Sequence, residues 1–101
     1  MSDTMISFKK ALGSIPADER YSEFPLGGSL TVGIYAPHES DDPHVPGTDV
    51  VYLVVNGSGF FVTEEERQPF GPGDLLFAAQ GTERLFEKFT PDFAVWVIAA
   101  G

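Results

Sequence analysis

Proline and glycine interrupt this chain so often that no helix or strand in it can be long. The 101 residues include eight prolines and eleven glycines, spread along the whole sequence. Both residue types break regular elements and favour tight turns. The runs between them are short, regularly spaced and rich in β-branched and aromatic residues, a pattern typical of an antiparallel sandwich or barrel. We therefore predict an all-β fold in which residues 1–101 form one domain.

One segment near the start has the period of a helix instead. Its apolar residues recur at offsets of three, four and seven, which places them on one helical face. These residues, within Ser7–Ile15, are Phe8, Ala11, Leu12 and Ile15. Pro16 ends the pattern, because proline cannot continue a helix. We expect a short N-terminal helical segment within residues 1–20, followed by a barrel over residues 21–99.

The strand signal is clearest in the middle of the chain. Val50–Val55 is a nearly continuous apolar run, as expected for a strand that is covered on both faces. Asn56-Gly57 follows it and suits a type I′ turn, so we expect a hairpin that returns along Gly59–Thr63. Glu64–Glu66 then forms a solvated hairpin tip. The other expected strands are Ser29–Tyr35, Gln68–Phe70, Leu75–Ala78, Arg84–Phe89 and Phe93–Ala99.

Charge and composition narrow the classes of partner. With 15 acidic against 6 basic residues, the chain has a net charge of −9, which repels nucleic acids and anionic membranes. It contains no cysteine, which excludes disulfides, thiolate metal sites and cysteine nucleophiles. Met1–Lys10 does not read as a signal peptide, and no apolar stretch reaches the roughly 18 residues of a membrane span. We expect a soluble, cytoplasmic protein that binds neither nucleic acid nor membrane.

Two stretches resemble the sequence motifs of cupins. In Gly71–Arg84, a Pro-Gly-Asp turn and two glycines, Gly73 and Gly81, match the register of the second motif, G-x5-P-x-G-x2-H-x3-N. Asp49–Gly59 is similar to the end of the first motif, G-x5-H-x-H-x3-E-x6-G. Small single-domain cupins also have segments like Tyr35-Ala36-Pro37 and Phe93–Val97. The resemblance implies an antiparallel double-stranded β-helix, the cupin or jelly-roll barrel.

The same register indicates a degenerate metal site. In metal-binding cupins, the family that the chain resembles, two histidines, a glutamate and a later histidine hold one divalent ion. The corresponding residues here are His44, Pro46, Val50 and Arg84. Proline and valine offer no lone pair to a metal, and arginine repels a cation, so we expect no cofactor. The alternative is one divalent transition metal held by a displaced set of ligands, His38, Asp41, Asp42 and His44.

Arg84 suggests a different kind of pocket. If Val50 faces the barrel interior, strand alternation and the family register place Tyr52, Arg84 and Phe86 inside as well. A guanidinium in a partly closed cavity needs an acceptor. That acceptor is either internal (Glu83, Glu87 or an aspartate of the loop before Val50) or a carboxylate or phosphate of a ligand. We hypothesise a small-molecule pocket lined by His44, Val50, Tyr52, Arg84 and Phe86. The alternative is an arginine that leans to the barrel mouth and pairs with a local glutamate.

Two classes of function follow. The first is metal-free binding of a small molecule, which could be anionic, or a structural or regulatory role. The second is a metal-dependent cupin enzyme, of isomerase or dioxygenase type, that uses the displaced ligands. The sequence does not decide whether the chain is an enzyme, and it identifies no catalytic residue. Because single-domain cupins usually pair, the resemblance also implies a homodimer, for which the apolar positions Val51, Leu53 and Val55 would suit burial.

Overall fold

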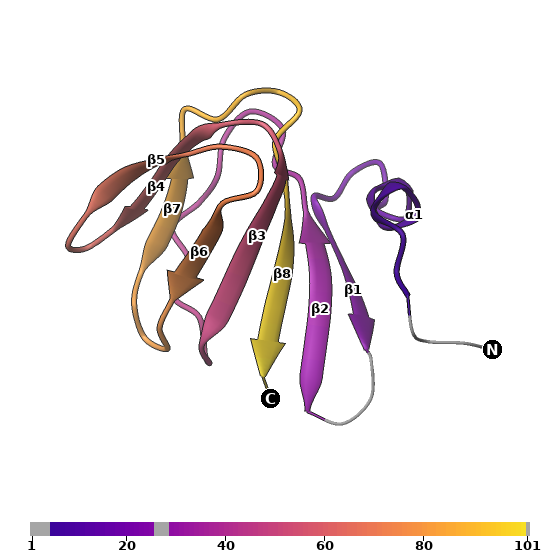
Figure 1. Cartoon of the computed structure of the whole chain (residues 1–101), viewed down its shortest axis with the longest axis horizontal. Helices are drawn as coiled ribbons and strands as arrows, with labels where there is room; N and C mark the ends of the chain where they lie inside the picture. The colour runs from indigo at the N-terminus through magenta and orange to yellow at the C-terminus, as the bar shows by residue number, and fades with distance from the viewer. Residues whose placement is uncertain (1–4, 26–28, 101) are drawn as a thin grey trace.

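The structure, a computed structural model, describes residues 5–25 and 29–100. In these residues one short helix precedes eight strands, which form two sheets (Figure 1). The elements are α1 (Phe8–Gly13), β1 (Tyr21–Pro25), β2 (Leu30–Tyr35), β3 (Val50–Asn56), β4 (Gly59–Thr63), β5 (Arg67–Phe70), β6 (Leu75–Ala78), β7 (Arg84–Glu87) and β8 (Ala94–Ala100). The five-stranded sheet has the order β1-β2-β8-β3-β6 and the three-stranded sheet the order β5-β4-β7. Every paired strand is antiparallel, so the predicted all-β antiparallel fold is confirmed.

The core lies between the two sheets. On β3, alternation turns Val50, Tyr52 and Val54 inward, and all three are buried. Aromatic rings from the opposite sheet meet them: the Phe86 ring lies 5.3 Å from the Tyr52 ring and 5.3 Å from the Phe61 ring, measured between centroids. Burial of several aromatic rings supplies a large share of the hydrophobic stabilisation of a domain of this size. The inward positions predicted from strand alternation are therefore buried as expected.

The predicted hairpin at Asn56-Gly57 is wrong. β3 pairs with β6 and β8, whereas β4 pairs with β5 and β7, so the chain crosses between the sheets at this point. Gly57 has a φ of 87°, but Asn56 has no positive φ and ends β3, so no type I′ turn forms. A Cβ on Gly57 would lie 2.6 Å from the Cα of Phe93. The preference of Asn-Gly for a tight turn is overridden because the crossing places β4 in the other sheet, where its side chains close the core against β3.

Other element boundaries differ in smaller ways. The helix is shorter than the predicted pattern: the Ser7 side chain caps its start by accepting from Lys10 N, and Ser14 follows its end. β1 is a strand that no apolar alternation indicates, and it forms by pairing along β2. β7 ends at Glu87 because Lys88 has a φ of 50°, outside the extended region. In the described part of the chain, no helix is long and apolar enough to cross a membrane.

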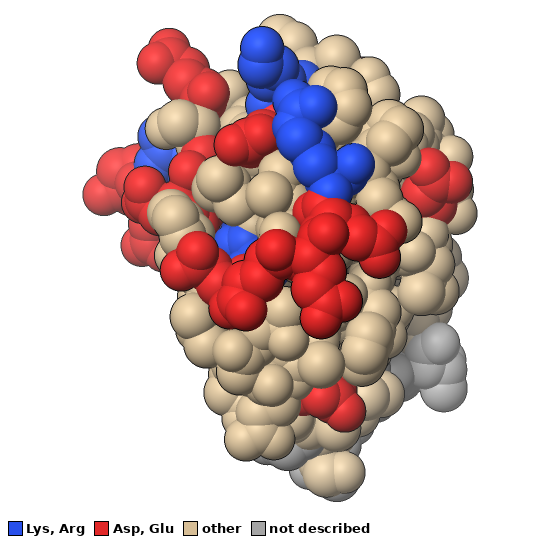
Figure 2. All heavy atoms as spheres, turned by 90° about the vertical axis from the view of Figure 1, so that its left-hand side faces the viewer, with Lys and Arg blue, Asp and Glu red and all other residues tan. Residues whose placement is uncertain are grey.

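The outer face of the five-stranded sheet is only partly covered. Helix α1 packs near β2 and β8, where the Phe8 ring lies 6.0 Å from the Trp96 ring. Toward the other edge, Leu75 and Phe77 of β6 are 64% and 54% exposed. At the end of the molecule away from α1, Glu64–Glu66 forms the exposed tip between β4 and β5, as predicted. Acidic side chains outnumber basic ones on that face (Figure 2).

Candidate functional site

A cavity of about 360 Å³ opens on the inner side of the five-stranded sheet. Strands β1, β2, β3, β7 and β8 contribute to its wall, together with the loop before β3. The lining residues are Tyr21, Tyr35, His44, Pro46, Gly47, Thr48, Val50, Tyr52, Arg84, Val97 and Ala99. A volume of this size is typical of sites for small molecules. Aliphatic and aromatic side chains make up most of the wall, so the few polar atoms in it decide what it can recognise.

The cavity brings together most of the predicted pocket. His44, Val50, Tyr52 and Arg84 line it, whereas Phe86 does not. Phe86 lies deeper, 1% exposed, in the aromatic core beneath the site. All four positions to which the cupin register assigns metal ligands, including Pro46, line this same cavity. The four positions that the sequence register aligned with metal ligands therefore lie around one cavity.

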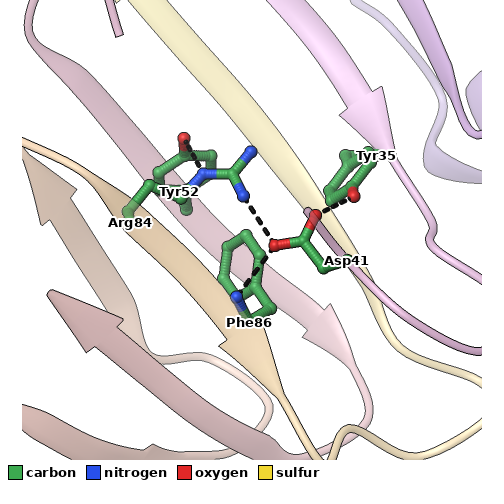
Figure 3. Close-up of polar contacts among 5 residues, drawn as sticks. All are labelled: Tyr35, Asp41, Tyr52, Arg84 and Phe86. Atoms are coloured by element: carbon green, nitrogen blue, oxygen red, sulfur yellow. Dashed lines mark hydrogen bonds and ion pairs between the residues drawn. The ribbon is translucent and has the colours of Figure 1, made fainter. Parts of the chain in front are cut away.

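Arg84 is held in a buried ion pair. The residue is 8% exposed, and its Nη1 donates to Oδ2 of Asp41 at 2.7 Å (Figure 3). Its Nε donates to the hydroxyl of Tyr52 at 2.9 Å. The acceptor is thus the loop aspartate, one of the internal options expected from the sequence. The alternative, an arginine at the barrel mouth paired with a local glutamate, is wrong: Glu87 pairs with Arg67 instead, at 3.3 Å.

The Asp41 carboxylate collects three donors. Besides Arg84 Nη1, the backbone N–H of Phe86 donates to Oδ2 at 2.9 Å, and the Tyr35 hydroxyl donates to Oδ1 (Figure 3). The Asp41 side chain is 2% exposed, so these bonds replace the water that a carboxylate needs. Sequence reasoning allowed a loop aspartate as the acceptor but named Asp41 itself only as a possible metal ligand, because a partner 43 positions along the chain leaves no local pattern. Its position in the fold is that of an internal counter-ion.

The displaced metal set is not brought together. Asp41 is engaged in the ion pair, while His38 lies beside Leu12 and Ile15 in a separate depression near α1. His44 is held at the cavity by its backbone, which exchanges two hydrogen bonds with Arg84, and Asp42 is exposed. Among residues 5–25 and 29–100, no three His, Cys, Asp or Glu side chains are grouped so that they could hold a metal ion.

Two tyrosines of the cavity wall have raised pKa values. Burial, then the hydrogen bond to Asp41 and its negative charge, raise the pKa of Tyr35 far above its ordinary value, although Arg84 opposes this. Burial and the nearby carboxylate of Glu23 raise the pKa of Tyr21 to about 12. Both hydroxyls therefore stay protonated near neutral pH. They donate to carboxylates of the protein itself and add no charge to the cavity.

Comparisons with known proteins place the fold. No protein-family model matches the chain, and no curated protein is detectably similar to it in sequence. Solved structures do match. A protein of Neisseria meningitidis is 12% identical, with a TM-score of 0.77 over 96% of this chain and 99% of its own. An RmlC-like cupin family protein with a double-stranded β-helix fold, from Methanocaldococcus jannaschii, is 13% identical, with a TM-score of 0.62 over 71% and 70%. The DMSP lyase DddQ of Ruegeria pomeroyi is 20% identical, with a TM-score of 0.68 over 96% of this chain and 55% of its own.

These similarities identify the architecture. The chain has the cupin fold, an all-β double-stranded β-helix with one short helix before it. The cupin-type fold that the resemblance of two motifs implied is confirmed. Identities this low show the fold and leave the activity to be argued from the site itself.

Replacing Asp41 by alanine is expected to destabilise the protein by about 3–5 kcal/mol, because it leaves a buried guanidinium without its counter-ion. Asp42→Ala is the matched control: its side chain is exposed, so we expect a change within about 0.5 kcal/mol. Urea denaturation measures both free energies of unfolding. Equal costs for the two variants would contradict the structural role assigned to Asp41.

Alkaline pH is expected to destabilise the protein through its tyrosines. The folded-state pKa values of Tyr21 and Tyr35 lie above the unfolded value of about 10, so the folded form binds more protons there. The stability that they contribute is complete below pH 10 and is lost as the pH rises further. The urea midpoint of Tyr35→Phe should therefore fall less steeply than that of the wild type between about pH 10 and pH 12. Parallel curves would show that Tyr35 does not titrate as the site requires.

Proposed function

We propose that this protein binds a small molecule in the cavity beside Arg84, without the help of a metal ion. One observation carries the proposal. Arg84 uses Nε and Nη1 within the protein, but its second terminal nitrogen, Nη2, has no acceptor among the described residues (Figure 3). In those residues, no fully buried side-chain nitrogen or oxygen lacks a partner. Nη2 is therefore reached through the cavity that Arg84 lines.

A donor held in this way is suited to recognition. The guanidinium is fixed by Asp41 and Tyr52, so its position costs little further entropy when a ligand binds. Hydrogen bonds in a cavity shielded from water discriminate strongly, because a ligand that fails to pair leaves the buried donor unsatisfied. The apolar wall, with Val50, Val97 and Ala99, supplies the contact area for the rest of the molecule. The site can thus select a ligand by shape and by one polar contact.

Filling the cavity tests the proposal. Ala99 lines it, whereas Ala100 is exposed and is the next residue on the same strand, so Ala99→Leu and Ala100→Leu form a matched pair. We expect compounds from a library of small amides, alcohols and carboxylic acids, selected by thermal shift, to bind the wild type and Ala100→Leu alike. Their affinity for Ala99→Leu should fall at least about tenfold in calorimetric titrations, because the added methyl groups take up ligand space. Equal affinity for both variants would place the ligand elsewhere.

We also propose that two copies of the chain pair through the outer face of the five-stranded sheet. By register, Val51 lies opposite Phe77 and Leu53 opposite Leu75, which makes one apolar patch of half-buried and exposed side chains. Contiguous exposed patches of this kind are typical of interaction surfaces. The cysteine-free, acidic composition supports a cytoplasmic location for the assembly.

Phe77→Glu is expected to convert the dimer to a monomer, because a carboxylate cannot be buried unpaired at an apolar contact. Val45→Glu is the control: Val45 is 54% exposed, like Phe77, but lies in the loop before β3. Sedimentation velocity at several concentrations distinguishes the two states. A wild-type protein that sediments as a monomer at high concentration would refute the proposed pairing.

A further inference from the structure

We infer that the ligand of the cavity is an uncharged molecule that presents a carbonyl-type oxygen to Arg84, and not an anion; this rests on the proposed function. The cavity contains a cation, so an anion is the obvious first choice for a ligand. The charges and hydrogen bonds around that cation point the other way.

The positive charge of Arg84 is already balanced. The carboxylate of Asp41 lies 2.7 Å from Nη1, and both side chains are buried. A ligand carboxylate would bring a second negative charge to a single buried cation, and an unbalanced charge in such a site is costly. The other titratable groups of the wall are the hydroxyls of Tyr21, Tyr35 and Tyr52, and His44, which is exposed at the cavity.

The field of the whole protein acts in the same direction. A net charge of −9 opposes the approach of any anion. Among the residues that the structure describes, no lysine and no second arginine lines the cavity to offset that repulsion. An uncharged ligand does not experience this repulsion, and the loss of its hydration shell costs much less than the loss of an anion's.

The unused donors suit one acceptor oxygen. The hydroxyl protons of Tyr35 and Tyr21 are donated to Asp41 and Glu23. The Tyr52 oxygen accepts from Nε of Arg84, and its own proton has no acceptor among the described residues. In a guanidinium, one N–H of Nη2 runs parallel to the Nε–H. The Tyr52 hydroxyl and Nη2 therefore present two donors on the same edge of the Arg84 fork, as a carbonyl oxygen with two lone pairs requires.

The experiment compares amides with carboxylates of the same skeleton. Benzamide and benzoate, and isobutyramide and isobutyrate, are titrated into the 101-residue protein at neutral pH. Binding is followed by NMR, including the Nε–H signal of Arg84. We expect each amide to bind at least about tenfold more tightly than its acid, because only the acid brings an unbalanced charge. Ala99→Leu should weaken the binding of the amides, and Ala100→Leu should not.

A variant of the counter-ion tests the cause. Asp41→Asn keeps the shape of the side chain but removes the negative charge that balances Arg84. The ratio of amide to acid affinity should therefore shift toward the acids by about tenfold or more. Asp42→Asn, at an exposed position, should leave the ratio unchanged. If Asp41→Asn does not fold, the wild-type ratio alone still decides the question.

The outcomes separate this inference from the proposed function. Acids that bind the wild type as tightly as the amides, or more tightly, overturn the uncharged ligand; if Ala99→Leu blocks them, the cavity remains the binding site. Binding of all four compounds that Ala99→Leu leaves intact overturns the site as well. If none of the four compounds binds, both the inference and the proposed function fail.

Discussion

The buried ion pair between Arg84 and Asp41 is the interaction on which the barrel's interior depends. Asp41 lies in the long loop between β2 and β3, and its carboxylate is bonded to a strand of each sheet: Tyr35 belongs to β2, and Phe86 and Arg84 to β7. One side chain therefore connects the two sheets and fixes the loop that passes between them. Such a charge is tolerable inside a protein only when it is paired and well hydrogen-bonded, and the three donors around Asp41, one of them cationic, meet that condition.

The pair also changes what a barrel of this fold can do at its centre. In the cupin register, the positions of the metal ligands all line the cavity, but the cation there is a covalent part of the chain. A metal ion accepts ligands from many directions and polarises them strongly, whereas a guanidinium offers a planar set of donors. The proposed function accordingly relies on directional hydrogen bonding within an apolar wall, and recognition of this kind does not need strong polarisation.

Strand content and inward-facing residues were predictable because they depend on period. Alternation along Val50–Val55 and the two-motif register suffice to place Tyr52, Arg84 and Phe86 inside. The crossing at Asn56-Gly57 was not predictable, because a local turn preference gives no information on which sheet the next strand joins. The partner of Arg84 was predictable only as one of several acidic residues: an aspartate in an irregular loop carries no periodic signal, and only the three-dimensional fold brings Asp41 to β7.

The place of β8 has a consequence for how the chain acquires this fold. β8 is the last strand in sequence order, yet it lies between β2 and β3 and pairs with both along most of its length. A nascent chain that has emerged only through β7 has two long strand edges with no strand between them, and such edges are sites of misassociation. Because β8 joins β2 to β3, the five-stranded sheet cannot be complete before β8 has been synthesised, and until then the cavity wall lacks the strand that carries Val97 and Ala99.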